Sequence, residues 1–492
     1  MDKGILRNVA INFVGLVLPT FVSLVTVPSY IHFLGVERYG VIALVWTLIG
    51  YFGILDLGMS MAAQNHISKA RASNDADECE RVFWSATWLN LVTGIIGGLI
   101  IYFGAFLYTA YFTKVSPELQ HEVYLALPWL ALAIPLANVS WVFAGAINGA
   151  ERFGVYNTNQ TIGTFLFQLL PLGAAWAMGP TLQNVLAAAV LARLIAAVML
   201  GRSAFKVLDI RAVRPPQFGV AKGLFSFGGW MLIASVTQMV MDSLDRVMLG
   251  TAMGAKFVTY YTVPQNLVTR LNIVPTALQR TLFPRLSAVE RAHADTLTQQ
   301  SLEFLNGVFT PVALVALLVL EPFLHLWVGN EIATVAAPVG RILIIAVWLV
   351  GQANVTRILI QSQVNPATAA RVGLFELPLF AGALWFGISH FGLPGAAVAV
   401  AGRSLFDYGV LLKFAAIRAR PIVLDMVAHL AFLLGSLWLA NVMPSLTSAI
   451  VAAVLVVAAN LVWSFTMTPA LRELARSLLS QLKLRLIPRK SA

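Results

Sequence analysis

Eleven ionisable side chains lie inside long apolar runs of this sequence, where a charge needs a physical reason to be kept. At the middle of a membrane a charge costs about 2.5–3.5 kcal/mol, so such residues usually face water or one another. The set contains six arginines, whose planar guanidinium matches the oxygens of phosphates and carboxylates. The members are Asp56, Arg193, Asp242, Asp245, Arg246, Arg270, Arg341, Arg357, Glu376, Arg403 and Asp407.

Polar residues accompany these charges at helical spacing in four segments of the second half. Residues three and four apart share one face of a helix, so each segment predicts a polar stripe. The stripes are Ser235, Gln238, Asp242, Asp245 and Arg246; Gln265, Thr269, Asn272 and Thr276, with Asn266 and Arg270 beside them; Asn354, Arg357 and Gln361; and Arg403 with Asp407. Together the four faces could line a water-filled cavity.

The composition requires helices that cross a membrane to position these stripes. Of the 492 residues, 59% are hydrophobic and 11% are charged, whereas soluble domains carry about 25% charged residues. The single cysteine, Cys79, excludes an internal disulfide, and the seven histidines show no metal-ligand spacing. We therefore expect an all-α polytopic membrane protein without a metal or another cofactor.

A spanning helix needs roughly 20 apolar residues, and the sequence predicts about fourteen such helices. The first apolar segment, near Val9–Ile31, is too long for a signal peptide and is interpreted as a retained span. The predicted centres are Leu18, Gly53, Ile95, Pro135, Phe167, Ala192, Ala234, Leu271, Leu314, Leu349, Phe380, Gly402, Phe432 and Val457.

The basic residues predict the orientation of these spans. With the N-terminus in the cytosol, 24 of the 33 lysines and arginines fall in inner segments. The outer loops hold only Arg38, Lys114 and Lys256. Because inner loops are enriched in positive charge, both termini are expected to be cytosolic. The net charge of +11 then indicates topology and attraction to anionic lipids, not binding to nucleic acid.

The longest inner connection contains "RAVRPPQ" and divides the chain near its middle. We expect an N-terminal lobe of six spans at 1–204, a cytosolic linker at 205–222 and a C-terminal lobe of six spans at 223–417. Two additional spans would occupy 418–468, and a basic tail 469–492. The leucine spacing in this tail suits a helix on the inner leaflet, although a solvated tail is an equally good interpretation.

The two predicted lobes share a sequence pattern at their first outer turn. "FLGVERYGVIALVWTL" begins at Phe33 and "AMGAKFVTYYTVPQNL" at Ala252, so that Gly35 matches Gly254. Both segments follow a helix running outward, which indicates lobes of the same orientation. Parallel repeats are a known construction of transporters, with the substrate site between the repeats.

Four segments carry a resemblance to a known family. They are "YIHFLGVERYGVIALVWTLIGYFGILDLGMSMAAQNHISKA" (Tyr30–Ala70), "FAGAINGAERFGVYNTNQ" (Phe143–Gln160), "SLDRVMLGTAMGAKFVTYYTVPQNL" (Ser243–Leu267) and "LFPRLS" (Leu282–Ser287). Over about residues 5–420 the chain resembles the bacterial oligosaccharide flippases. These export O-antigen and exopolysaccharide repeat units and belong to the multidrug/oligosaccharidyl-lipid/polysaccharide exporter superfamily.

The resemblance implies two lobes around a V-shaped central cavity and a mechanism of alternating access. It implies a cargo of undecaprenyl-pyrophosphate-linked oligosaccharide, moved from the inner to the outer leaflet of the bacterial plasma membrane. The expected partners are this cargo and membrane lipids, with contact to a polysaccharide polymerase left open. The two-lobe plan works as a monomer and requires no catalytic residue.

The cargo gives the interior arginines a chemical role. Guanidinium groups suit pyrophosphate oxygens, and we expect Arg270 and Arg357 to bind them, followed by Arg246 and Arg403. The amides of Gln265, Asn272 and Asn354 would suit sugar hydroxyls.

The alternative is that each arginine merely neutralises an acid. This interpretation is favoured for Asp242–Arg246 and Arg403–Asp407, which lie four residues apart. Arg270 and Arg357 have no acid within one turn of their own helix. Arg341 is expected to extend toward the outer surface, and Arg193 fits either interpretation.

Acidic residues of the spans are candidates for ion coupling. Asp56 and Glu376 could bind a proton or cation, or could hydrogen-bond a neighbouring helix; Asp242 and Asp245 are further candidates. Three charges at predicted inner turns could form a gate or could simply anchor the topology. They are Glu151, Arg152 and Arg285.

The sequence leaves two other classes of function as alternatives. A cation-coupled multidrug antiporter of the same superfamily would favour an acidic cavity, whereas arginines dominate here. A membrane enzyme acting on the same lipid would need a sizeable outer loop or an exposed acidic pair, and neither is visible. No nucleotide-binding motif occurs, so an ion gradient or exchange is the expected energy source.

Overall fold

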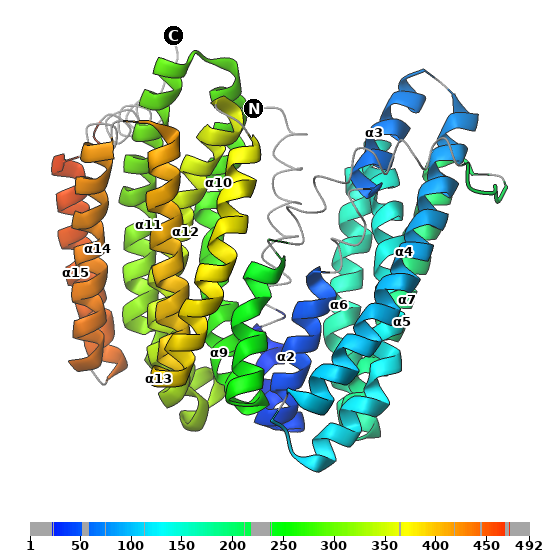
Figure 1. Cartoon of the computed structure of the whole chain (residues 1–492), viewed down its shortest axis with the longest axis horizontal. Helices are drawn as coiled ribbons and strands as arrows, with labels where there is room; N and C mark the ends of the chain where they lie inside the picture. The colour runs from blue at the N-terminus through cyan, green and yellow to red at the C-terminus, as the bar shows by residue number, and fades with distance from the viewer. Residues whose placement is uncertain are drawn as a thin grey trace, which may run out of the picture. The chain divides into compact units, whose positions relative to one another are not determined.

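The computed structural model describes residues 22, 24–51, 59–73, 75–112, 114–210, 212–217, 237, 239–363, 366–417, 419–442, 445–467 and 472. Throughout these residues the regular structure is helical (Figure 1). The contacts divide the chain into an N-terminal unit, Met1–Thr259, and a C-terminal unit, Tyr260–Ala492. The all-α prediction is thereby confirmed.

The division lies later in the chain than the linker at 205–222. Residues 239–252 are helical and pack with the N-terminal unit. Two hydrogen bonds fix them there: Tyr108 donates to the carbonyl of Val247 at 2.8 Å, and Lys114 donates to that of Ala252 at 2.9 Å. The boundary between the units, after Thr259, therefore falls within the next helix, α9 (Ala255–Val268).

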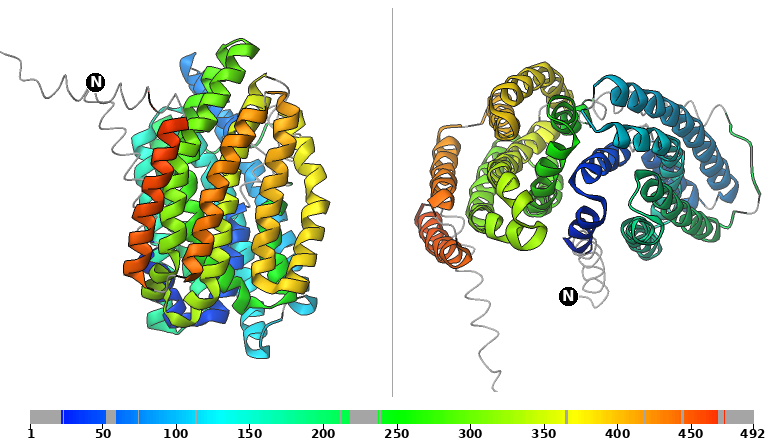
Figure 2. Two further views of the ribbon diagram at one scale, coloured as in Figure 1. Left: turned by 90° about the vertical axis from the view of Figure 1, so that its left-hand side faces the viewer. Right: turned by 90° about the horizontal axis from the view of Figure 1, so that it is seen from below.

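The N-terminal unit is built around one long helix, α5 (Pro117–Gly149), which contacts most of the other helices of the unit. Its elements are a short apolar helix, Leu24–Leu34, followed by α2 (Val36–Tyr51), α3 (Met59–Ala72), α4 (Ala76–Tyr111), α5 (Pro117–Gly149), α6 (Phe153–Met178) and α7 (Leu182–Leu208). Helix α5 packs against α3, α4 and α7, and α6 packs against α7. The right-hand view of Figure 2 shows these helices end-on.

Small residues let α4 and α5 approach closely. A Cβ placed on Gly94 would come within 2.6 Å of Pro135, and one on Gly98 within 2.6 Å of the carbonyl oxygen of Ala131. Small residues at such interfaces are typical of membrane helices, where close packing drives association. Asp75 caps the start of α4 by accepting a hydrogen bond from the backbone of Glu78.

The C-terminal unit is built around α11 and α12. After α9 (Ala255–Val268) come η2 (Thr269–Asn272), α10 (Ile273–Ala288), α11 (Arg291–Val328), α12 (Asn330–Gln363), α13 (Pro366–Ala415), α14 (Ala419–Val442) and α15 (Leu446–Met467). Helix α12 packs against α10, α11 and α13. The left-hand view of Figure 2 shows α14 and α15 beside α11, on which both pack.

Helix α13 consists of two arms that meet at Gly392. This glycine adopts φ 62° and ψ −138°, which breaks the helix. Beside the bend, a Cβ on Gly387 would lie 2.5 Å from the carbonyl oxygen of Gly395. The two arms can therefore pack this closely only because residue 387 is a glycine. The two arms carry the centres predicted for spans eleven and twelve, Phe380 and Gly402.

The predicted spans agree with the helices wherever the structure describes them. Eleven of the fourteen centres lie on helices, and Leu18, Gly53 and Ala234 lie outside the described residues. In the described part of the chain, nine helices are long and apolar enough to cross a membrane. That number is smaller partly because α13 is counted once, and because η2 divides the eighth span into two short helices. The tail after residue 467, apart from Arg472, also lies outside the described residues.

The two glycines matched in sequence occupy the same kind of turn. Gly35 has φ 80° and Gly254 has φ 99°, and each directly precedes a helix, α2 or α9. Glycine adopts this left-handed backbone without the steric penalty of other residues. The repeat inferred from the sequence therefore extends to local geometry.

Candidate functional site

Four charged side chains meet where α12 packs along α13; we call them the four-charge cluster. Arg357 of α12 donates through Nη2 to Oδ2 of Asp407 at 2.6 Å. Arg403 forms a looser ion pair with Glu376, with 3.9 Å between Nε and Oε2. Glu376 lies on the first arm of α13, and Arg403 and Asp407 lie on the second. Two cations and two anions are thus held together.

The partners within the cluster differ from those expected. Spacing favoured an Arg403–Asp407 pair on one helix and left Arg357 without an acid, but Asp407 pairs with Arg357. The prediction failed because it considered only acids on the same helix. Packing of α12 against α13 supplies a nearly buried carboxylate from the neighbouring helix, with Asp407 only 4% exposed.

The cluster is balanced in charge but incompletely hydrogen-bonded. Within the described chain, no hydrogen-bond partner occurs for Nε of Arg357 and Arg403, Oε1 of Glu376 or Oδ1 of Asp407, and all four atoms are buried. A buried polar atom without a partner costs about 1–3 kcal/mol. The cluster therefore retains donors and acceptors that a proton, water or anion could satisfy.

Arg270 lies at a break between two helices. The 3₁₀ turn η2 separates α9 from α10, and a 3₁₀ stretch inside a helix often marks a hinge. The Arg270 side chain is exposed, and no ion pair or hydrogen bond holds it among the described residues. Its neighbour Asn272 has a buried Oδ1 without a partner in the same part of the chain. Because η2 packs against α12, this turn adjoins the helix that carries Asn354 and Arg357.

Arg341 does not extend to the surface as expected. It is 3% exposed, and its guanidinium donates to Glu321 of α11 at 2.5 Å and to Asn441 of α14 at 2.9 Å. It also donates to the carbonyl of Ala440 at 3.0 Å. The expectation was wrong because α11 and α14 enclose this part of α12, so Arg341 joins three helices.

The remaining candidates are distributed over both units. Asp245 is buried and accepts a hydrogen bond from the backbone of Arg246 at 2.8 Å; Asp242 and Arg246 are half-buried and make further contacts. Gln265 of α9 and Asn354 of α12 are half-buried. Exposed positions hold Glu151, Arg152 and Arg285, and Asp56 lies outside the described residues.

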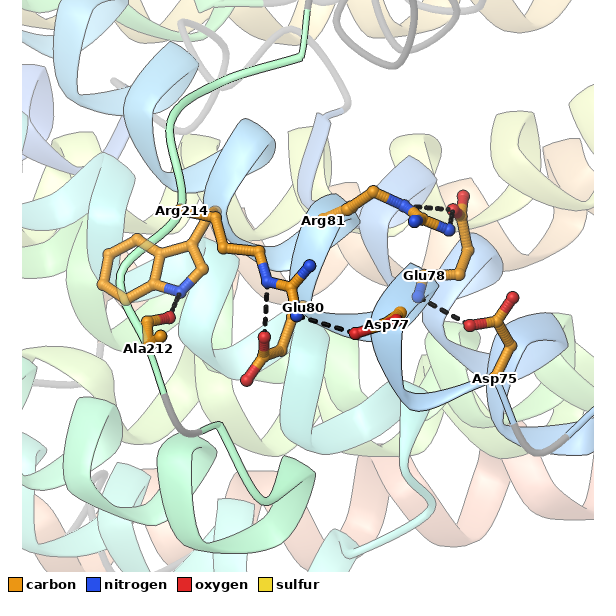
Figure 3. Close-up of polar contacts among 8 residues, drawn as sticks. Asp75, Asp77, Glu78, Glu80, Arg81, Ala212 and Arg214 are labelled. Atoms are coloured by element: carbon orange, nitrogen blue, oxygen red, sulfur yellow. Dashed lines mark hydrogen bonds and ion pairs between the residues drawn. The ribbon is translucent and has the colours of Figure 1, made fainter.

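Residues 212–217 of the predicted linker are docked on α4, which the sequence did not indicate (Figure 3). Arg214 donates to Glu80 at 2.6 Å and to Asp77 at 2.7 Å. The indole of Trp84 donates to the carbonyl of Ala212 at 2.8 Å, and Trp88 donates to that of Arg214 at 3.1 Å. The acidic residues at the start of α4 could have indicated this docking, because their charge complements the basic residues of the linker.

A buried polar network fixes the last two helices to α11, and the sequence did not single it out either. Asn306 donates to Asp425 at 2.7 Å, and Asp425 lies 3.7 Å from Nε2 of His429. The other ring nitrogen of His429 lies 3.1 Å from Asn460. Hydrogen bonds between polar side chains are a common means of holding membrane helices together.

Arg193, ambiguous in sequence, lines a cavity of ≈ 230 Å³ in the N-terminal unit. Its guanidinium carbon lies 4.6 Å from the ring centre of Phe167, and its Nε is buried without a partner in the described chain. A desolvated cation–π contact contributes about 2 kcal/mol, less than the cost of about 2.5–3.5 kcal/mol for a charge at mid-membrane. The ring alone therefore does not account for this arginine.

The fold is that of multi-pass membrane transporters. The chain is similar to the solved structure of the lipid II flippase MurJ in an inward closed conformation, with a TM-score of 0.69 and 11% identity over 92% of this chain and 98% of that one. An inward-facing multidrug transporter of the MATE family, in the MOP superfamily, gives a TM-score of 0.68 and 13% identity over 82% and 95%. At these identities the likeness establishes the fold alone.

The sequence comparison is more specific. A candidate O-antigen transporter of Shigella flexneri is 26% identical over 413 residues, which cover 82% of this chain and 96% of the relative. The profile of the family described as "Polysaccharide biosynthesis protein" matches residues 5–290, more than half of the chain. The chain belongs to this family.

Proposed function

We propose that this protein is a flippase that moves an oligosaccharide linked to undecaprenyl pyrophosphate from the inner to the outer leaflet of a plasma membrane. Family membership and the Shigella flexneri relative support a transporter in polysaccharide biosynthesis rather than an enzyme. Movement by alternating access, with both termini in the cytosol, completes the proposal.

The observation that supports an anionic cargo is the guanidinium of Arg270, which is exposed and forms no ion pair or hydrogen bond with the residues that the structure describes. It lies on a 3₁₀ turn between two helices, and such turns often mark a hinge. Charge-assisted bonds from guanidinium to phosphate oxygens are among the strongest hydrogen bonds in proteins. In this proposal Arg270 binds the pyrophosphate, and Gln265, Asn272 and Asn354 contact sugar hydroxyls.

The four-charge cluster suggests how an ion gradient could be coupled to this cargo. In the described structure Arg357 is neutralised by Asp407, and Arg403 by Glu376. Protonation of either acid would change the net charge of the cluster from zero to +1 and release a guanidinium. An anionic cargo would therefore bind more tightly to the protonated cluster than to the neutral one, so that proton binding and cargo binding are linked.

The charge balance also distinguishes this proposal from a cation antiporter. The MATE likeness concerns the fold and does not determine the sign of the cargo. A cationic substrate requires excess negative charge, whereas the cluster is neutral and Arg270 adds a positive charge. The described C-terminal unit therefore suits an anion better than a cation.

The test is transport in proteoliposomes that contain a fluorescent undecaprenyl-pyrophosphate oligosaccharide. We expect Arg270→Ala to slow movement between leaflets by at least about tenfold, the effect of losing one charge-assisted hydrogen bond. Arg270→Lys should retain part of the rate, because a charge remains.

Arg202→Gln provides the matched control, since Arg202 is an exposed arginine of another helix, α7. Protein recovery and thermal stability are measured for every variant. An Arg270→Ala protein that is folded and transports at the normal rate would contradict the assigned role.

A further inference from the structure

The cavity that Arg193 lines lies between α5, α6 and α7, all within the N-terminal unit. Its walls include Trp141 of α5, Tyr156, Gln160 and Phe167 of α6, and Arg193 of α7. Its volume of ≈ 230 Å³ is several times that of one water molecule, about 30 Å³. The space therefore accommodates a small polar group.

Some polar groups of the wall are already committed to the protein. Ser140 donates to the carbonyl of Leu136 at 2.6 Å, Thr164 donates to that of Gln160 at 2.8 Å, and Asn159 donates to Ser203 at 3.1 Å. Gln168 accepts a hydrogen bond from Thr26 at 2.8 Å. These contacts fix the shape of the wall.

Four other side chains of the wall have polar atoms that form no hydrogen bond within the described chain, and they belong to Trp141, Tyr156, Gln160 and Arg193. They offer an indole N–H, a phenol, an amide and a guanidinium. The groups reach the cavity from three helices, so that one occupant could engage several of them. This arrangement is typical of a binding pocket with a few convergent polar groups.

The charge of the cavity is positive. Among the lining residues that the structure describes, Arg193 is charged and none is acidic. The guanidinium is held over the face of Phe167, and this ring packs 6.0 Å from Trp46, which in turn contacts Tyr30 at 5.1 Å. A row of aromatic rings thus lies beside a cation that forms no ion pair with the described residues.

We propose that this cavity is an anion-recognising carbohydrate subsite. Arg193 takes an anionic oxygen group, either a carboxylate of an acidic sugar or a phosphate, and Tyr156, Gln160 and Trp141 contact the attached hydroxylated ring. The aromatic faces suit the C–H faces of a sugar, and the uncharged donors suit its hydroxyls. The choice of carbohydrate rests on the proposed function; a phospholipid headgroup would present similar anionic chemistry.

The experiment measures binding to the full chain in nanodiscs of zwitterionic phosphatidylcholine. The probes are a glucuronic-acid-containing oligosaccharide, its neutral carboxyl-reduced form and inorganic pyrophosphate. Trp141 lines the cavity, so the signal is the tryptophan fluorescence change that is lost in Trp141→Phe. We expect saturable binding of the acidic oligosaccharide and at least about tenfold weaker binding of the neutral form.

Arg193→Gln should weaken binding by at least about tenfold, and Arg193→Lys less. Gln160→Ala, at an exposed position, tests the same cavity if Arg193→Gln does not fold. Arg202→Gln is the matched control on the same helix and should bind normally. Competition by pyrophosphate assigns the anion to the lipid carrier, and competition by the uronate alone assigns it to the sugar; both support an anion site.

Equal binding of the acidic and neutral oligosaccharides together with no competition by pyrophosphate, or unchanged binding by folded Arg193→Gln, would overturn the proposal. A fluorescence change that requires phosphatidylglycerol in the nanodisc, and no sugar, would overturn the carbohydrate assignment. Normal flipping and normal binding by Arg193→Gln would refute the subsite and leave the flippase proposal standing. If binding depends on Arg193 but the wild-type protein does not flip the lipid-linked sugar, the subsite stands and the flippase proposal is refuted.

Discussion

At the scale of single residues, partners decide what each interior arginine can do. The sequence identified interior charges as candidates, because ionisable residues in apolar runs are conspicuous. It could not identify their partners, since Arg357 and Asp407 are 50 positions apart and meet only through helix packing. Arg341 shows the same limitation, with its acid on α11 and its amide on α14.

The Arg357–Asp407 pair is expected to stabilise the C-terminal unit strongly. Asp407→Asn leaves a guanidinium without its counter-charge, and breaking a buried pair costs about 3–5 kcal/mol; because Arg357 is 25% exposed, we expect the lower end of that range. Thermal unfolding of the detergent-purified protein measures the effect.

The double variant Arg357→Met/Asp407→Leu should recover much of the lost stability, since no unpaired charge remains. Glu376→Gln is the internal comparison and should cost less, because its ion pair with Arg403 spans 3.9 Å. Equal stability of Asp407→Asn and the wild type would contradict the pairing.

At the scale of elements, helices were predictable and their irregularities were not. Apolar runs located every span centre that the structure describes, because membrane helices need long apolar segments. The 3₁₀ turn at Arg270 was not predictable, because it depends on the backbone geometry between α9 and α10. The docking of residues 212–217 on α4 likewise depends on contacts across more than 120 positions.

Arg214 is expected to hold the linker segment on α4. Arg214→Gln removes its ion pairs with Asp77 and Glu80, so amide hydrogen exchange of residues 212–217 should become faster. High salt should produce a similar, smaller change, because exposed charge pairs are screened.

Arg81→Gln is the matched control, because Arg81 forms its ion pair with Glu78 of its own helix. Exchange rates of residues 212–217 that are equal in Arg214→Gln and the wild type would show that the two tryptophan contacts suffice.

At the scale of the whole molecule, the family was recognisable from motifs, whereas the cargo depends on local charge. The turns at Gly35 and Gly254 support a repeat, and the family profile covers residues 5–290. Similar folds nevertheless serve a lipid II flippase and multidrug transporters. A fold therefore does not define a cargo. The proposal of an anionic cargo rests instead on Arg270 and on the two arginines of the four-charge cluster.

The most direct test compares two cargoes in the same proteoliposomes: the undecaprenyl-pyrophosphate oligosaccharide and a lipophilic cationic dye. The proposal predicts protein-dependent movement of the pyrophosphate-linked sugar between leaflets, reduced by Arg270→Ala, and no protein-dependent efflux of the dye. Efflux of the dye without movement of the lipid-linked sugar would contradict the flippase assignment and indicate a cation transporter.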